Sequence, residues 1–372
     1  MLFLPLWLLI DNFFLSLFFL STIFFRNRNI SFKNIIFFSL FIFFIYNVII
    51  GLFSNQLSKE VQNFIKILPL ILIPISMLTL NKDSTLRGLF YLLIGILIMQ
   101  LISIYGIIDY YYFSEGKKMA LRNYAKINTI LRFERPYVGY FSALSLIISY
   151  ILFKYKSRWV FLTTAILSIL LILIISARLA IITVLFSFVL LIIYEINKRT
   201  IKIIFLLGLM LLGFGVLKFS DTPIKHRFSQ IKYDARLIIW EGASNIFEEN
   251  SKYIFGLGGQ QQIKEDLLKY YKNKAEFEYP PDKDRFVKLN YNTHNQYINE
   301  LLRGGVTGLF LFILPFGFLV YKSLKLKLLA PILLLMSVVI FSFVENVLDR
   351  QIGVYIVAII LSISNNLINE EK

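Results

Sequence analysis

Two arginines and a histidine at the edges of long apolar runs are the residues of this sequence most suited to chemistry. Arg178 interrupts an apolar run over 159–193. A charge at membrane depth costs roughly 2.5–3.5 kcal/mol on insertion scales, so such residues usually have a function. The planar guanidinium binds phosphate oxygens through two hydrogen bonds. The alternative is an interfacial anchor whose charged end reaches water.

The second arginine, Arg236, lies in a segment whose apolar residues recur at helical spacing. Asp234 is a candidate N-cap for this helix. Trp240 follows Arg236 by four residues, so the two share a helix face. We expect Trp240 to pack the segment onto the membrane surface, and Arg236 to bind an anionic group as well.

The histidine, His294, stands immediately before the apolar run 297–321. Asn292 or Thr293 is expected to cap that helix. A histidine in the first helical turn feels the positive end of the helix dipole, which favours the neutral imidazole that accepts protons. The alternative is a structural histidine at a helix start. The only other histidine, His226, lies among basic residues and is predicted to be solvated.

Other motifs give weaker signals. Gly256-Leu-Gly258 permits a tight turn but lacks the spacing of a P-loop, so a helix-ending turn is favoured. Asp282-Lys-Asp284 has the pattern of a metal-binding pair, but it lies among basic residues, and the chain has no cysteine and only two histidines. We therefore expect no metal and no cofactor. Asp11 and Glu345 are further candidates, with pairing of Glu345 to Arg350 as the simpler interpretation.

The elements that position these residues are membrane helices. The chain has 372 residues, of which 57% are hydrophobic and 17% charged. Its apolar runs are solid, without the alternation of barrel strands. The net charge of +16 reflects basic cytoplasmic loops rather than nucleic-acid binding. The fold class expected is an all-α polytopic membrane protein with about eleven transmembrane helices and one large, mainly helical extracytoplasmic loop.

The expected spans are 3–25, 33–53, 64–80, 88–108, 137–153, 159–175, 179–195, 201–217, 297–321, 328–344 and 353–368. The first run is long and has no small-residue cleavage site, so it is predicted to be a helix rather than a signal peptide. Alternate connections are basic, which places them in the cytoplasm and places 109–136 and 218–296 outside. Arg178 then lies at the outer apex of a helical hairpin. The organisation expected is helices one to eight over 1–217, the loop over 218–296, and helices nine to eleven over 297–372.

The order of these motifs resembles the O-antigen ligase and O-antigen polymerase superfamily. Its members carry an arginine at a hairpin apex, then a long outer loop with Arg-x-x-x-Trp and Gly-x-Gly segments. The loop closes with His-Asn before a glycine-bearing span. The matching residues, over 176–308, are Arg178, Arg236, Trp240, Gly256, Gly258, His294, Asn295, Gly305 and Gly308. Arg303 stands where members often have an acidic residue, which leaves the acidic partner of the histidine open.

The resemblance implies a bacterial inner-membrane glycosyltransferase whose donor is a glycan linked to undecaprenyl diphosphate. Its acceptor would be a second lipid-linked glycan, lipid A-core or a protein. The moderate length of the outer loop favours a polymerase or ligase over a protein-modifying enzyme, and the sequence does not choose between those two. In this scheme Arg178 and Arg236 neutralise the diphosphate, and His294 takes the proton of the acceptor hydroxyl. A transporter or flippase is the alternative from another class, but no repeat or matched pair of broken spans supports it. Nothing in the sequence argues for a membrane scaffold.

Overall fold

Helices form nearly all of the regular structure in the computed structural model, which describes residues 6, 8–24, 35–53, 57–78, 80–113, 124–156, 160–198, 200, 235–277 and 280–370. These residues contain no strand. In chain order the α-helices are α1 (Leu8–Phe24), α2 (Ile35–Leu52), α3 (Leu57–Ile67), α4 (Pro69–Met77), α5 (Lys82–Ile108), α6 (Tyr124–Leu131), α7 (Arg135–Lys156), α8 (Val160–Ile175), α9 (Arg178–Glu195), α12 (Ala235–Asn250), α13 (Gln260–Asn273), α14 (Pro280–Leu289), α15 (Gln296–Lys325), α16 (Leu329–Ser342) and α17 (Gln351–Asn369). A π-helical turn, Asp109–Phe113, follows α5.

Within the described residues, seven stretches of helix are long and apolar enough to cross a membrane. They are α2, α3 with α4, α5 with the turn after it, α7, α9, α15 and α17, and shorter apolar segments lie in α1, α8 and α16. These ten elements coincide with ten of the eleven expected spans. The expected span 201–217 lies outside the described residues, so the count of eleven stays a prediction. The all-helical polytopic membrane class is confirmed.

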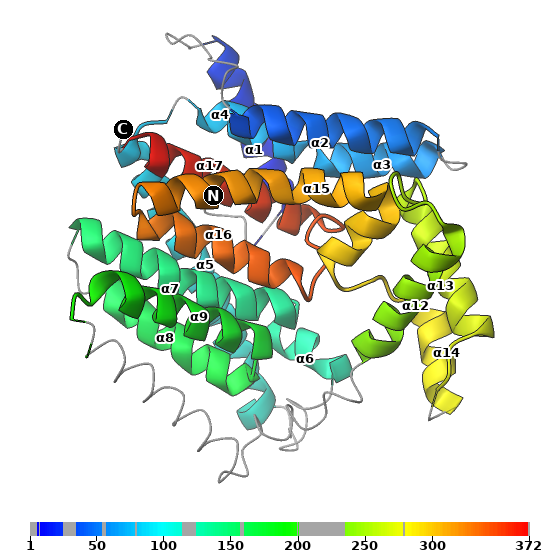
Figure 1. Cartoon of the computed structure of the whole chain (residues 1–372). Helices are drawn as coiled ribbons and strands as arrows, with labels where there is room; N and C mark the ends of the chain where they lie inside the picture. Colours follow the sequence, from blue (N-terminus) through cyan, green and yellow to red (C-terminus); the bar gives the residue numbers. More distant parts are fainter. Residues whose placement is uncertain are drawn as a thin grey trace.

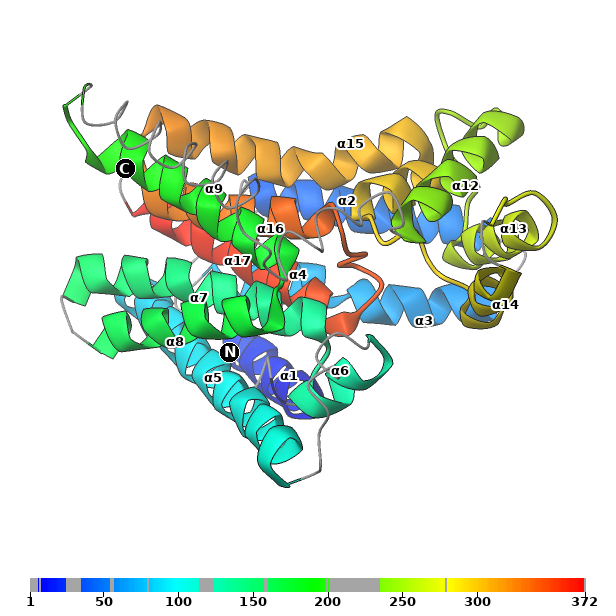
Figure 2. The ribbon, with the colours of Figure 1, turned by 90° about the horizontal axis from the view of Figure 1, so that it is seen from below.

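The core of the bundle is α17, which packs against α4, α15 and α16 (Figures 1 and 2). About nine-tenths of its apolar window, 89%, is buried inside the protein. A helix that is apolar on every side is typical of the centre of a bundle. Beside this core, α5, α7, α8 and α9 form a second group, in which buried Gln100 of α5 donates hydrogen bonds to Ser142 of α7 and Ser168 of α8. Such interhelical hydrogen bonds hold membrane helices together.

One end of the bundle gathers most of the polar loops. There the side chain of Arg135, at the start of α7, donates to the carbonyls of Ile175 and Ser176 at the apex between α8 and α9. At the same end, residues 343–350 between α16 and α17 contact the start of α15. Helices α12, α13 and α14 form a separate layer at this end, away from the C-terminus (Figure 1). We call this the α12–α14 end.

A break in α15 shapes this end. Gly305 has φ 63° and ψ −160°, a conformation that only glycine adopts readily, and it interrupts the helix. The backbone groups freed by the break pair with the turn between α12 and α13. Leu257 N and Gly258 N donate to Leu302 O and Arg303 O at 2.7 and 3.1 Å. In return, Val306 N and Thr307 N donate to Tyr253 O and Ile254 O at 2.8 and 3.3 Å.

Which end of the helix bundle faces the cytoplasm can be measured directly. Because the short basic connections mark the cytoplasmic side, we expect a reporter fused after Asn273 in α13 to be extracytoplasmic. A reporter fused after Lys325, at the end of α15, should be cytoplasmic. Fusions to alkaline phosphatase and to green fluorescent protein at each site report the side of the membrane on which it lies. If both sites lay on one side, the arrangement would be contradicted.

Candidate functional site

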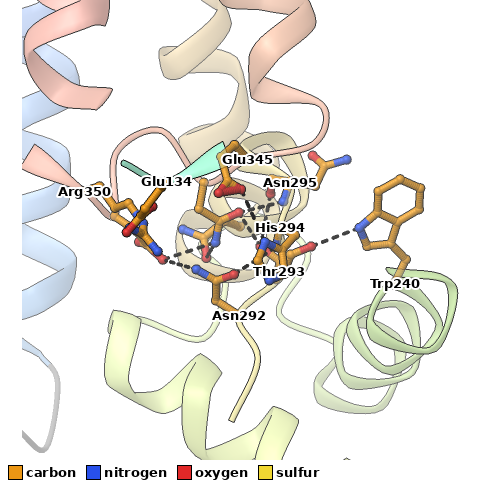
Figure 3. A network of polar contacts seen from close by, with 11 residues as sticks. Glu134, Trp240, Asn292, Thr293, His294, Asn295, Glu345 and Arg350 are labelled. Carbon is orange, nitrogen blue, oxygen red and sulfur yellow. Dashed lines mark hydrogen bonds and ion pairs between the residues drawn. The ribbon is translucent and has the colours of Figure 1, made fainter. Parts of the chain in front are cut away.

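His294 lies in a short loop, residues 290–295, that precedes α15. Its Nδ1 is 3.3 Å from Oε2 of Glu345, at the long end of hydrogen-bond distances (Figure 3). The histidine side chain is 29% exposed and the glutamate side chain only 7%. The site therefore pairs an accessible imidazole with a buried carboxylate behind it. A proton on Nδ1, directed at Glu345, leaves the lone pair on Nε2 to accept another proton.

The backbone of His294 is in the left-handed region, with φ 45°. For a residue other than glycine this costs of order 1–3 kcal/mol and persists only where neighbouring groups fix it. Here Asn292 Oδ1 accepts from the His294 backbone N at 3.2 Å. Asn346 Oδ1 accepts from Asn295 N at 2.6 Å and from the buried Thr293 hydroxyl at 2.9 Å. The hydrogen bonds to Asn346 thus fix the loop 290–295 against residues 343–350.

The cap of α15 differs from the prediction. Asn295, rather than Asn292 or Thr293, is the N-cap, and its side chain accepts from the backbone N of Tyr297 and Ile298. His294 consequently precedes the helix instead of lying in its first turn. The side chain of Asn292 does not cap the helix; its Nδ2 donates to Asp349 Oδ2 at 3.1 Å. The orientation of His294 depends more on these contacts and on Glu345 than on the helix end.

Glu345 and Arg350 do not form the ion pair that the simpler interpretation of the sequence predicted. Arg350 forms an ion pair with Glu134 at the start of α7, and Glu345 faces His294 (Figure 3). Arg303, which stands where an acidic residue was expected, lies 3.6 Å from Glu60 of α3, and both side chains are buried. The acidic partner of the histidine therefore comes from the loop after α16.

Trp240 reaches the same loop from α12. Its Nε1 donates to the backbone carbonyl of Thr293 at 2.9 Å (Figure 3). Tyr271 of α13 donates from its hydroxyl to Tyr291 O at 3.2 Å. Burial raises the pKa of Tyr271, so its hydroxyl stays protonated and remains a donor. The α12–α14 layer thus fixes the loop from the other side. Trp240 acts here as a hydrogen-bond donor, and its packing on the membrane surface stays a prediction.

The glycines of the motif meet at the break in α15. A Cβ on Gly256 would lie 2.5 Å from Gly305 N, and a Cβ on Gly305 would lie 2.3 Å from Ile254 O. Both have positive φ. Gly258, also with positive φ, approaches Ile50 of α2, and a Cβ on Gly308 would lie 3.2 Å from Glu300 O. The Gly256–Gly258 segment is therefore not a simple helix-ending turn, because it docks into the broken helix.

The two arginines occupy helix starts. Arg178 is the first residue of α9 and follows Ser176, which has φ 47°. The apex that carries it points toward the end of the bundle that holds α12 (Figure 1). Arg236 lies in the first described turn of α12, one turn before Trp240. Asp234, its expected N-cap, lies outside the described residues. A helix start adds the positive end of the dipole to the guanidinium charge, which favours anions.

Several polar residues of this site were not anticipated. Asp349 Oδ2 accepts from Asn292, Asn346 and Gln260, at 3.1, 3.2 and 3.4 Å. Together with Lys66 of α3 and Arg303 of α15, Asp349 and Gln260 line a small polar pocket. The signal in the sequence is the cluster Glu345, Asn346 and Asp349 between two apolar runs, at the end of the bundle that holds His294. Of the aspartate pair, Asp284 is exposed on α14, and the side chain of Asp282 lies outside the described residues, as does that of Asp11.

Comparison with known families supports the resemblance found in the sequence. Residues 136–313 match the family model described as O-antigen ligase, which confirms the resemblance to that superfamily. The matched segment, a little under half of the chain, runs from α7 into α15 and contains Arg178, Arg236 and His294. Glu345 and Asp349 lie beyond it. No curated protein matches the chain.

Proposed function

Because the chain carries an O-antigen ligase domain over residues 136–313, we propose that it is a glycosyltransferase of surface polysaccharide assembly in the bacterial inner membrane. Its donor is a glycan on undecaprenyl diphosphate, and its acceptor is a sugar hydroxyl on another lipid-linked glycan or on lipid A-core. The reaction takes place at the outer face of the membrane. The observation that carries the proposal is the contact between His294 and buried Glu345 at the α12–α14 end of the bundle.

The first step of the proposed mechanism concerns the acceptor. His294 Nε2 removes the proton from the attacking hydroxyl as its oxygen bonds to the anomeric carbon of the donor sugar. Glu345 holds the imidazole in the required orientation and stabilises the positive charge that the ring acquires. The anomeric carbon–oxygen bond to undecaprenyl diphosphate breaks, and the diphosphate leaves with the bonding electrons. Glu345 is a positioning residue, since it acts through His294.

The second step concerns the leaving group. Arg178 and Arg236 bind the diphosphate and neutralise the charge that develops on it. Their places at helix starts support this role, because backbone N–H groups there add favourable electrostatics. Arg135 supports Arg178 indirectly, since its guanidinium holds the carbonyls of Ile175 and Ser176 at the apex. Gly139 of α7 also allows close packing, as a Cβ there would lie 2.7 Å from that of Ala177.

The proposed electrostatics need no divalent cation. We therefore expect purified protein in phospholipid vesicles to transfer glycan from lipid-linked donor in excess EDTA. Loss of turnover in EDTA, with recovery on adding magnesium, would contradict the arginine mechanism. Absence of transfer, with donor moved across vesicles instead, would favour a flippase. In a deletion strain, single-repeat bands on a polysaccharide gel would indicate a polymerase, and unattached lipid-linked chains would indicate a ligase.

A further inference from the structure

Three consecutive large apolar side chains are exposed in the turn between α12 and α13. Tyr253, Ile254 and Phe255 are 47%, 62% and 66% exposed. Single exposed apolar residues are normal on proteins, but contiguous ones mark a contact surface. Tyr253 also packs edge-on against Phe247 of α12, with 5.2 Å between ring centroids. The turn therefore presents an apolar tip at the edge of the α12–α14 layer.

This apolar tip continues the surface of a membrane-spanning helix. The backbone hydrogen bonds from Val306 and Thr307 place Tyr253 and Ile254 directly beside α15. On α15 the side chains of Val306 and Phe310 are 56% and 60% exposed. Because α15 is long and apolar enough to span a membrane, these side chains face lipid. The turn and the helix thus form one continuous apolar surface.

Part of the backbone of the turn is paired inside the protein. In hydrocarbon, every peptide group must find its partner inside the protein. At the break in α15, residues 253–258 pair with two carbonyls, of Leu302 and Arg303, and with two N–H groups, of Val306 and Thr307. The same hydrogen bonds satisfy the carbonyls of Tyr253 and Ile254. These hydrogen bonds pair four backbone groups of the turn inside the protein, which lowers the cost of bringing the turn to the membrane boundary.

The position of the break along α15 fixes the depth. From Lys322, a basic residue at the opposite end of α15, to Gly305 the helix rises about 26 Å at 1.5 Å per residue. The hydrocarbon core of a bilayer is about 30 Å thick. Gly305, and the turn that docks on it, therefore lie near the boundary between acyl chains and headgroups. Tyrosine is enriched at that boundary.

We propose that Tyr253, Ile254 and Phe255 form a membrane anchor, inserted among phospholipid acyl chains of the leaflet nearest α12–α14. The anchor holds the α12–α14 layer against the break in α15 and so keeps Trp240 within reach of the loop before that helix. It depends only on the apolar surface and the backbone pairing. It stands whether or not the chain is a glycosyltransferase.

The chain has no cysteine, so a single introduced cysteine can be labelled without background. We would attach a nitroxide spin label to Ile254→Cys and, separately, to Phe255→Cys, in the full chain reconstituted in phospholipid vesicles. Collision rates with oxygen, which partitions into lipid, and with a water-soluble nickel chelate report the depth of the label. Phe310→Cys on α15 is the lipid-facing control, and Asn273→Cys, exposed at the end of α13, is the aqueous control.

The expected result is that both turn labels resemble Phe310, with a gain in oxygen collisions and a loss of nickel-chelate collisions relative to Asn273. Labels that resemble Asn273 would overturn the proposal, because the turn would then lie in water. Low accessibility to both reagents would also overturn it, since protein rather than lipid would cover the turn. Gel filtration in detergent selects the variants that fold, and either turn position suffices for the test.

Discussion

We expect His294→Ala to lower glycan transfer by roughly 10²–10⁴-fold, the usual contribution of a general base. The imidazole is the proton acceptor in the proposed reaction, and no other titratable side chain of the described loop 290–295 can replace it. Its side chain is partly exposed, so its removal leaves little cavity and the variant should fold. The measurement is the initial rate of transfer with purified protein in vesicles, at saturating donor and acceptor.

The chain supplies a control for this experiment in His226, its only other histidine. His226→Ala should transfer glycan at close to the normal rate. Glu345→Gln should fall between the two, with kcat reduced and KM for both substrates nearly unchanged, because Glu345 orients His294 without touching substrate. A near-normal rate for His294→Ala would remove the histidine from the mechanism. Equal loss of folded protein in all three variants would instead indicate a structural defect.

The helices could be predicted from the sequence because the hydrophobic effect and the length of a membrane span leave little freedom. Ten of the expected spans correspond to helices or apolar helical segments of the described residues. The predicted span 64–80 is less regular. Its actual helical stretch is Leu57–Met77, divided between α3 and α4 near Pro69. The predicted span omits the polar first turns of α3, in which buried Glu60 lies 3.6 Å from Arg303 of α15.

The order of the motifs predicted the family, but the contacts around His294 required the fold. Glu345 is 51 residues from His294, and the pairing depends on α16 returning the chain to the start of α15. Arg350, the apparent neighbour of Glu345 in sequence, finds Glu134 of α7 instead. The sequence near the start of α15 likewise could not show whether Asn295 or Thr293 caps the helix. Both are polar side chains suited to an N-cap, but the Thr293 hydroxyl donates a hydrogen bond to Asn346.

The glycines illustrate a different limit. Gly256 and Gly305 could each be assigned to a turn or a helix on local grounds. Their true constraint is mutual, because each approaches the backbone of the other segment too closely for a side chain. The Gly304–Gly305 pair near the start of α15 permits a break, but the pair alone does not show that the helix breaks there. The sequence could indicate that these glycines matter, and only the packing of two distant segments explains why.

The second large effect is expected for the arginines: Arg178→Lys and Arg236→Lys should each lose most of the transfer activity while still inserting in the membrane. Lysine keeps the positive charge at the start of α9 or α12, but it cannot bind two phosphate oxygens in one plane. The loss should appear in kcat, since neutralisation matters most as charge develops on the leaving diphosphate. The measurement is the rate of transfer over a range of lipid-linked donor concentrations.

The choice of lysine separates the two interpretations of these residues. An interfacial anchor only needs a long side chain with a charged end, and lysine extends to water as well as arginine does. Anchoring therefore predicts near-normal transfer for both variants, and that outcome would contradict diphosphate binding. Arg285→Lys is the matched control, because Arg285 is exposed on α14 and has no role in the proposed reaction. Its activity should be unchanged, which would show that exchange of arginine for lysine at this end of the bundle is harmless by itself.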